Sequence, residues 1–283
     1  MSNHIVAPGL SEGPIGVFDS GYGGLTILRE IRKALPSPDY IYLGDNARTP
    51  YGTRSFELVY EFTLQAVRYL FERGCPLVIL ACNTASAKAL RSIQQRDLPA
   101  IAPQRRVLGV IRPTVEILSK VSKTGSVGLF GTPGTVASQS YDMEIAKLHP
   151  SLRLHSHACP MWVPLVENHE ANGPGADYFV KKDIQALVET NPEMDTIILG
   201  CTHYPLLLEK IKQYIPKGIT ILPQGEIVAA SLCDYLQRHP EIDSAISRGG
   251  GVEYLTTEQA DKFAPMASAF MSEPVSARKI ELT

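Results

Sequence analysis

Short apolar runs alternate with helix-like stretches along almost the whole chain, and this alternation constrains the fold more than any other feature. Strands separated by helical connections are predicted to pair in parallel, because each helix carries the chain back across the face of the sheet. The chain is therefore predicted to be an α/β protein with mostly parallel sheets. The predicted strands are Ile15–Asp19, Tyr40–Leu43, Leu77–Ala81, Val107–Val110, Ser126–Phe130, Arg153–His157, Thr196–Leu199 and Ile219–Leu222.

Three helices stand out in the sequence. The clearest follows Ser55, which can cap its first turn, and ends at Gly74, a residue type that suits the end of a helix. A second is predicted to begin near Thr84 and to continue through "ASAKALRSIQQR", and a third follows Pro205 in "LLLEKIKQYIP".

The chain also repeats itself weakly. "IGVFDSGYGGLT" (Ile15–Thr26) is echoed by "VGLFGTPGTVAS" (Val127–Ser138), and each is a strand that runs into a glycine-rich turn. Cys82 in "PLVILACNTASA" and Cys201 in "DTIILGCTHYPLL" each end another strand-like run. Because both members recur in the same order, two related α/β halves that face each other are the economical interpretation.

Polar residues follow these strands at the edge where open α/β sheets bind ligands, beyond the carboxyl ends of the strands. The sequence therefore predicts one shared cleft. Its predicted lining is Asp19, Ser20, Cys82, Asn83, Thr84, Thr132, Cys201, Thr202 and His203.

The two cysteines are candidate acid–base groups. A cysteine between a strand end and a helix N-terminus lies in a positive partial field, which lowers its pKa and favours the thiolate. The alternative is a buried structural cysteine, but the polar neighbours Asn83, Thr84 and Thr202 favour a functional site. Two facing thiols suit racemisation, which needs a base on one face of a carbon and an acid on the other.

Other polar groups are placed to assist the thiols. Asp19 could orient one thiol or accept its proton, while His203 and Glu167 could serve the other. Asp19 as a helix cap and Glu167 as an exposed charge are the alternatives. In the loop "GDNARTPYG", the backbone N–H groups of Tyr51 and Gly52 could bind a carboxylate, although a solvated turn is the default for such composition.

Composition excludes several classes of protein. A formal net charge of −2 argues against a strongly basic nucleic-acid binder, and no apolar run approaches the length of a membrane span. The start of the chain lacks a signal-peptide pattern, so a cytoplasmic protein with reduced cysteines is expected. Five cysteines without a C-x-x-C pair, and the scattered histidines His4, His149, His155 and His157, predict no metal site. The glycine-rich turns match neither nucleotide-binding motif, so no cofactor is expected.

Taken together, "FDSGYGGL", "GDNARTPYG", "ACNTAS", "GVIRP", "GTPGT", "CPMWVPLVE" and "GCTHYPLL" closely resemble the motifs of glutamate racemases, in the family order, over about Ile15 to Ala230. The resemblance implies cofactor-independent interconversion of L- and D-glutamate, which supplies D-glutamate for peptidoglycan. It implies that Cys82 and Cys201 are the catalytic acid–bases and that Glu167 partners the second cysteine. The glutamate site is implied to be lined by Asp19, Ser20, Tyr51, Gly52, Asn83, Thr84, Thr202 and His203.

The same resemblance implies the domain organisation. Two α/β subdomains related by pseudo-twofold symmetry are expected, the first from residues 1–110 plus 222–283 and the second from residues 111–221. A homodimer is compatible with the resemblance. The chain departs from the family pattern at Asn46, at Thr114 and in "LPQGE" (Leu222–Glu226), none of which is a proposed catalytic group, so the departures are expected to affect regulation and assembly. The tail after about Gly249 carries no recognised motif.

Three other functions remain open at this point. An aspartate racemase would share the two cysteines, but the Asp-Ser-Gly turn and His203 favour glutamate. A two-lobed solute-binding module would have no need of the thiols. A cysteine amidohydrolase needs a nucleophile–base pair, and Cys201 and His203 would point to opposite faces if their strand continued.

Overall fold

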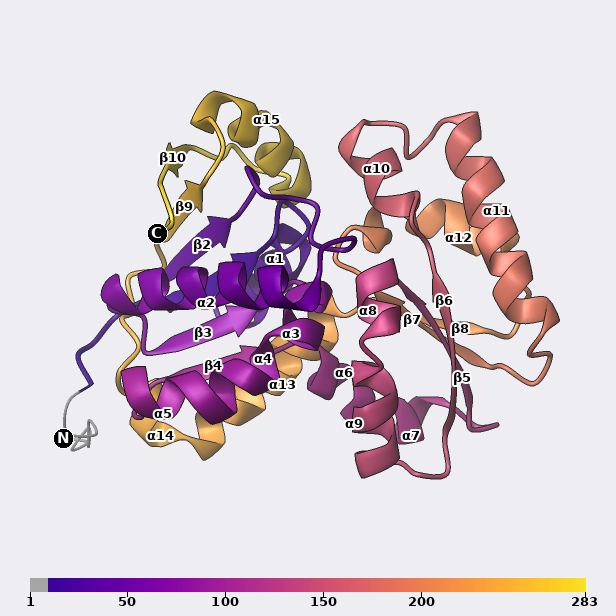
Figure 1. Cartoon of the computed structure of the whole chain (residues 1–283), viewed down its shortest axis with the longest axis horizontal. Coiled ribbons are helices and arrows are strands. Elements are labelled where there is room, and N and C mark those ends of the chain that lie inside the picture. The colour runs from indigo at the N-terminus through magenta and orange to yellow at the C-terminus, as the bar shows by residue number, and fades with distance from the viewer. Residues whose placement is uncertain (1–9) are drawn as a thin grey trace.

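The structure is a computed structural model that describes residues 10–283 (Figure 1). The molecule is built on two separate parallel sheets. The first sheet has six strands in the order β10-β9-β2-β1-β3-β4, and the second has four in the order β6-β5-β7-β8. Every pairing between neighbouring strands of the two sheets is parallel, so the predicted fold class is confirmed. We call the part built on the six-stranded sheet the first lobe and the part built on the four-stranded sheet the second lobe.

The strands are β1 (Ile15–Asp19), β2 (Tyr40–Gly44), β3 (Leu77–Leu80), β4 (Arg106–Gly109), β5 (Ser126–Gly131), β6 (Arg153–Ala158), β7 (Thr196–Gly200), β8 (Thr220–Leu222), β9 (Val252–Thr256) and β10 (Ala277–Lys279). The α-helices are α1 (Leu25–Ala34), α2 (Phe56–Glu72), α3 (Asn83–Lys88), α4 (Leu90–Ser92), α5 (Leu98–Ile101), α6 (Ile111–Glu116), α7 (Leu118–Val121), α8 (Pro133–Ala137), α9 (Ser140–Leu148), α10 (Trp162–Glu167), α11 (Pro174–Glu189), α12 (Leu208–Tyr214), α13 (Gly225–Arg238), α14 (Pro240–Asp243) and α15 (Ala260–Met271). A π-helical turn spans Ile93–Asp97, and a 3₁₀-helical turn spans Tyr204–Leu207.

Each of the eight predicted strands forms, with ends that differ by one residue at most. Their burial explains the agreement, because β1, β2, β3, β5 and β7 are buried along their whole length and therefore appear in the sequence as continuous apolar runs. The predicted boundary at residue 222 falls on Leu222, which is the last residue of β8 in the second sheet. The division into residues 1–110 plus 222–283 and 111–221 stays a prediction.

The predicted ends of α2 are confirmed, but the prediction of a single helix after Cys82 is wrong. Ser55 accepts a hydrogen bond from the Leu58 N–H at 3.3 Å, and Gly74 follows α2 with a φ of +88°. After Cys82 the single predicted helix is instead divided into α3, α4, a π turn and α5. Pro99 lies in the first turn of α5 and cannot donate a backbone hydrogen bond to the preceding turn, which explains why the helix widens there.

The tail that shows no motif is part of the first sheet. β9 pairs with β2, with Tyr254 opposite Tyr42, and β10 extends the sheet beyond β9. In Figure 1, α15 lies beside these two strands near the C-terminus. The chain therefore leaves the first lobe after β4, builds the second lobe, and returns to complete the sheet in which it began.

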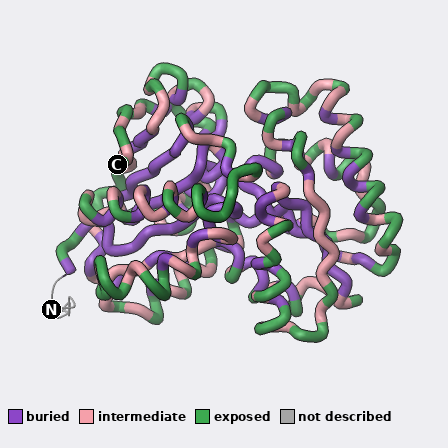
Figure 2. Tube along the Cα trace, viewed as in Figure 1, coloured by how far each residue is buried: buried purple, intermediate pink, exposed green. Residues whose placement is uncertain are grey.

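Buried segments run through the middle of each lobe and between the lobes, while exposed residues lie mainly on the outer helices (Figure 2). One cluster of buried apolar side chains includes Val17 and Tyr42 of the first lobe together with Phe130, Trp162 and Leu199 of the second. Within residues 10–283, no helix combines the length and the apolar character needed to cross a bilayer.

Candidate active site

A cavity of about 110 Å³ lies where the carboxyl ends of the strands of the two lobes face each other. From the first lobe it is lined by Ser20, Thr49, Pro50, Tyr51, Gly52, Thr53, Cys82, Asn83 and Thr84; from the second by Thr132, Pro133, Cys159, Pro160, Val163, Pro164, Cys201, Thr202 and His203. The predicted cleft residues thus come together, with the exception that Asp19 and Glu167 are not part of the lining. A larger hollow lies between α1 and the end of α15, and no thiol lines it. Its charged residues are already paired, Arg32 with Glu273, and Arg29 and Lys33 with Glu30.

Cys82 lies at the junction of β3 and α3 and is 6% exposed. Its thiol donates to the Ser20 hydroxyl at 3.4 Å, and its sulfur accepts from the Ala85 N–H at the same distance. Burial and the nearby Asp19 carboxylate raise the pKa of Cys82 to about 12, although the contacts with Ser20 and Ala85 act the other way. The prediction that the helix N-terminus lowers the pKa of this cysteine is therefore wrong, because the short helix does not compensate for burial of the thiol.

Cys201 follows β7, and its sulfur lies 3.9 Å from Nδ1 of His203. The strand ends at Gly200 and the chain turns, so the condition under which these two side chains would point to opposite faces is not met. Nε2 of His203 lies 3.0 Å from the Glu167 carboxylate. Burial lowers the pKa of His203, but its contacts with Cys201 and Glu167 outweigh burial and raise the pKa to about 10. His203 is thus held as an imidazolium between a thiol and a carboxylate.

Asp19 is fully buried at the end of β1, behind the wall of the cavity. Its carboxylate accepts from the Gly21 N–H at 2.9 Å and from the Thr202 hydroxyl at 3.5 Å. Burial raises the pKa of Asp19 above its usual range, and the positive charge of His203 offsets only part of this. Asp19 therefore holds the loop before α1 and also places a carboxylate near Cys82. It does not cap α1, whose N-cap is Gly24 without a side-chain cap, so the capping alternative is wrong.

The loop between β2 and α2 is tied down rather than solvated. The Tyr51 hydroxyl and Nε of Arg48 both donate to Asp45, and the hydroxyl of Thr257, beyond β9, donates to the same carboxylate at 2.8 Å. The Gly52 carbonyl accepts from the N–H of Gly134 at 2.7 Å, so the loop touches the second lobe. Binding of a carboxylate by the N–H groups of Tyr51 and Gly52 stays a prediction.

Gln224 is the residue of this region that sequence reasoning missed. It is 2% exposed and hydrogen-bonds to the Asn83 side chain at 2.5 Å across 141 residues of sequence. The departure at "LPQGE" therefore also reaches a predicted substrate-binding residue, while its effect on regulation and assembly stays a prediction. A glutamine just before a helix gives no local sign of such a distant partner, so no pattern in the sequence could have found it.

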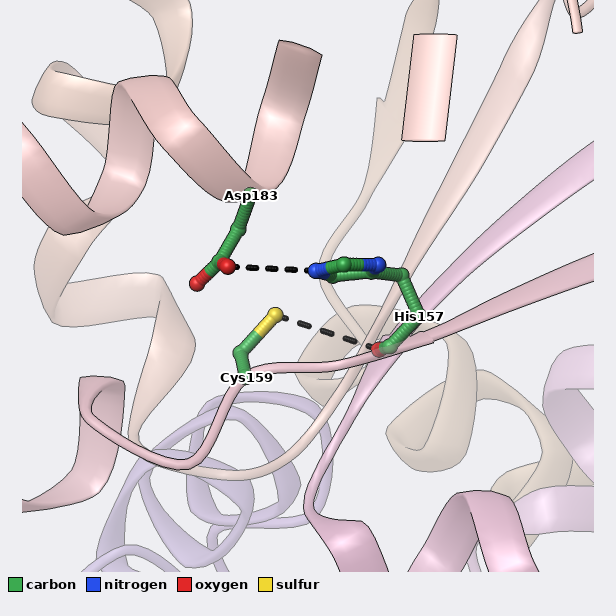
Figure 3. Close-up of side chains that lie close together, drawn as sticks. All are labelled: His157, Cys159 and Asp183. Carbon is green, nitrogen blue, oxygen red and sulfur yellow. Dashed lines mark hydrogen bonds and ion pairs between the residues drawn. The ribbon is translucent and has the colours of Figure 1, made fainter. Parts of the chain in front are cut away.

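Within residues 10–283, one group of side chains has the composition of a metal site, and it lies at the end of β6 (Figure 3). Nε2 of His157 is 3.1 Å from the Asp183 carboxylate on α11, and the Cys159 thiol donates to the His157 carbonyl at 3.8 Å. The His157 and Asp183 side chains pair with each other, and the Cys159 thiol is satisfied by a backbone carbonyl, so each group has a partner without a metal ion. His4, one of the histidines considered from sequence, lies outside the described residues.

Known proteins resemble this chain closely in sequence and structure. The family model described as Asp/Glu/hydantoin racemase matches residues 15–232. A glutamate racemase from Ruegeria sp. is 39% identical over 272 residues, covering 93% of this chain and 98% of that protein. The crystal structure of a glutamate racemase from Bacillus anthracis superposes with a TM-score of 0.86 at 35% identity, covering 95% of this chain and 98% of the other. A glutamate racemase from Francisella tularensis, solved in complex with D-glutamate, has a TM-score of 0.85 at 29% identity, covering 96% and 98%.

Proposed function

This chain belongs to the Asp/Glu/hydantoin racemase family, and we propose that it interconverts L- and D-glutamate through proton transfers at Cys82 and Cys201, without a cofactor. The observation that carries the proposal is that Cys82 of the first lobe and Cys201 of the second lobe line the same small cavity. A base and an acid on opposite faces of one carbon are what inversion of that carbon requires. The D-glutamate formed would supply peptidoglycan synthesis.

The two thiols are supported by different neighbours, which suggests how a turnover begins. Cys82 is held as a thiol by burial and by the Asp19 charge, so it is ready to donate a proton. Cys201 lies beside the His203 imidazolium, and in this direction of the reaction we assign it the role of the base, which it performs as a thiolate. The thiolate takes the Cα proton, the electron pair remains on Cα as a carbanion, and the thiol on the other face protonates that carbanion.

After one such turnover the protons on the two sulfurs have exchanged sides. Cys201 is then the thiol and Cys82 the thiolate, which is the starting state for the reverse reaction. A substrate of the opposite configuration that reacts in this state returns both protons to their original sulfurs, while Asp19 stays near Cys82 and His203 stays in contact with Cys201.

The walls of the cavity fit a small polar substrate. The polar residues Thr84, Thr202 and Asn83 line a space of about 110 Å³, well below the few hundred Å³ of sites for larger ligands. Aspartate is the alternative substrate, because it carries the same groups around Cα and is one methylene shorter.

The experiment is to incubate the purified protein in heavy water with L-glutamate and, separately, with L-aspartate, adding no cofactor. We expect the optical rotation of the glutamate solution to decay to zero and the product to carry deuterium at Cα. A parallel sample with EDTA should behave identically, because no step is assigned to a metal. Decay of optical rotation with aspartate alone would show that aspartate is the substrate. If the optical rotation did not decay and no deuterium entered Cα, the protein would be a binding module rather than a racemase.

A further inference from the structure

Asn83 follows Cys82 directly, and its side chain is held from behind by a buried ring of polar groups. We propose that Gln224 is a positioning residue for the racemisation proposed above, on which this inference rests. It fixes the orientation of the Asn83 amide, and thereby the positions of the amide oxygen and the amide nitrogen. Gln224 contributes no atom to the lining of the cavity, so it acts through Asn83.

The ring contains three side chains that are almost completely buried. Nδ2 of Asn83 donates to Oε1 of Gln224 at 2.5 Å, and the Tyr141 hydroxyl donates to Oδ1 of Asn83 at 2.7 Å. Nε2 of Gln224 closes the ring by donating to the Tyr141 hydroxyl at 2.9 Å. Asn83, Tyr141 and Gln224 are each 2% exposed or less, so no solvent can replace a lost partner without cost.

The Val110 carbonyl determines which group donates and which accepts in every hydrogen bond of the ring. The Thr114 hydroxyl donates its single proton to the Val110 carbonyl at 2.8 Å, so its oxygen can only accept from Gln224. The group of Gln224 that faces Thr114, at 2.8 Å, must therefore be the NH₂ group. Nε2 of Gln224 also lies 3.3 Å from the same Val110 carbonyl, which again requires a donor.

With the Gln224 nitrogen fixed, its oxygen must face Asn83. A rotation of the Asn83 amide by half a turn would then oppose two oxygen atoms, Oδ1 of Asn83 and Oε1 of Gln224, without a proton between them. The buried oxygens would repel and both would lose a hydrogen bond, so only one orientation of Asn83 is stable. One N–H and one lone pair of Asn83 remain for the cavity, in positions that Gln224 has set.

The ring also joins the parts of the chain that cross between the lobes. Asn83 begins α3 in the first lobe, Tyr141 belongs to α9, and Thr114 lies on α6 just after the chain leaves β4. Gln224 lies between β8 and α13, where the chain returns. The orientation of Asn83 therefore depends on residues from both segments that connect the lobes. A change in the distance between these segments would alter the orientation of the Asn83 amide.

The test is a double-mutant cycle between Gln224→Met and Asn83→Ala. Methionine keeps the length of the side chain and removes both polar ends, so we expect kcat/KM for glutamate to fall by roughly tenfold or more. If Gln224 acts only through Asn83, the same substitution in an Asn83→Ala background should leave kcat/KM within about twofold of Asn83→Ala alone. Equal effects of Gln224→Met in both backgrounds would overturn the proposal, because a general loss of packing does not depend on Asn83.

Two further variants test whether lost stability or misfolding accounts for the effect of Gln224→Met. Thr63→Val removes a buried hydrogen bond inside α2, from Thr63 to the Val59 carbonyl at 2.6 Å, and should lower thermal stability without lowering kcat/KM. If Gln224→Met does not fold, Tyr141→Phe removes the other partner of Asn83 and should show the same dependence on Asn83.

A measurement without substrate separates this inference from the proposed function. In the ¹⁵N-labelled wild-type protein, the side-chain NH₂ group of Asn83 should exchange with water slowly, and in Gln224→Met rapidly. A wild-type protein that racemises no glutamate but shows this difference would contradict the proposed function alone. Equally slow exchange in both proteins, or full activity of Gln224→Met in an active enzyme, would contradict the role of Gln224.

Discussion

Cys82 and Cys201 occupy equivalent places in their lobes but meet opposite charges. Cys82 has the Asp19 carboxylate behind it, whereas Cys201 has the His203 imidazolium beside it. Both sulfurs line the cavity, and the other three cysteines differ from them in chemistry or position: Cys75 and Cys233 lie away from the cavity, and the thiol of Cys159 is turned toward the His157 carbonyl. The pair is therefore distinguished by its neighbours as well as by its place at strand ends.

Single replacements of the thiols should divide the cysteines into two groups. Cys82→Ala and Cys201→Ala should each abolish racemisation, because the remaining thiol can remove a proton or supply one but cannot do both on opposite faces. Cys75→Ala, Cys159→Ala and Cys233→Ala should keep kcat within a few-fold of wild type, although loss of the buried Cys75 and Cys159 should reduce stability. Activity in a protein lacking both Cys82 and Cys201 would rule out the two-thiol mechanism.

The raised pKa of His203 should make the free energy of unfolding depend on pH. A group whose pKa is raised on folding, here to about 10 from about 6.5, stabilises the protein fully below the unfolded value. That contribution is lost as pH rises through the folded value. The unfolding free energy of wild type minus that of His203→Asn, measured with urea, should thus decrease between about pH 6.5 and pH 10. A difference that stays constant or increases over this window would show that His203 is not held as an imidazolium.

At the scale of elements, the loop before α1 packs closely against the turn after β7. A Cβ atom on Gly23 would lie 2.1 Å from Oγ1 of Thr202 and 2.6 Å from Nδ1 of His203. The Thr26 hydroxyl donates to the Thr202 carbonyl at 3.1 Å across the same contact. The absence of a side chain at Gly23 is therefore what allows the first lobe to support the second lobe's histidine.

Gly23→Ala should displace His203 and lower kcat/KM by roughly tenfold or more, since misplaced catalytic groups lose rate steeply. Gly21→Ala, two residues earlier in the same loop, is the matched control, because its Cβ would meet nothing nearer than Oγ1 of Thr49 at 3.5 Å. Kinetics and melting temperatures of both variants would test the contact. Similar activity losses in the two variants would refute a specific role for the space at Gly23.

The elements that sequence predicts well are those whose burial is uniform. A strand such as β7 is buried on both faces, so its apolar run is visible without knowledge of its neighbours. β9 is partly exposed at its start and β10 is mostly exposed. β9 forms against the edge that β2 offers, and β10 forms against β9. The meeting of Cys82 and Cys201 at one cavity was predictable because parallel strands bring their ends together. Gln224 was not, since its role depends on which side chains happen to surround it.

At the scale of the whole molecule, the site is complete only when both lobes and the tail are in place. The Thr84 hydroxyl of α3 lies 3.0 Å from that of Thr132, before α8, and so joins the lobes beside the cavity. Phe270 of α15 packs edge-on against the His203 ring with centroids 6.0 Å apart. The C-terminal segment thus covers the histidine that supports Cys201, although its sequence shows no motif.

The two halves of the site should be separable by isotope effects, although not by equilibrium measurements. Enantiomers have equal free energy, so kcat/KM must be equal in both directions for every variant, and no mutation can make the enzyme one-way. If Cys82 removes the proton from D-glutamate, as the family resemblance implies, Asp19→Asn should slow that step, because the raised pKa of Asp19 suits it to accept the thiol proton. The primary isotope effect with Cα-deuterated D-glutamate should then increase, and that with deuterated L-glutamate should increase less or decrease. His203→Asn should show the opposite bias, since His203 contacts Cys201. The same bias in both variants would mean that Asp19 and His203 serve one thiol rather than two.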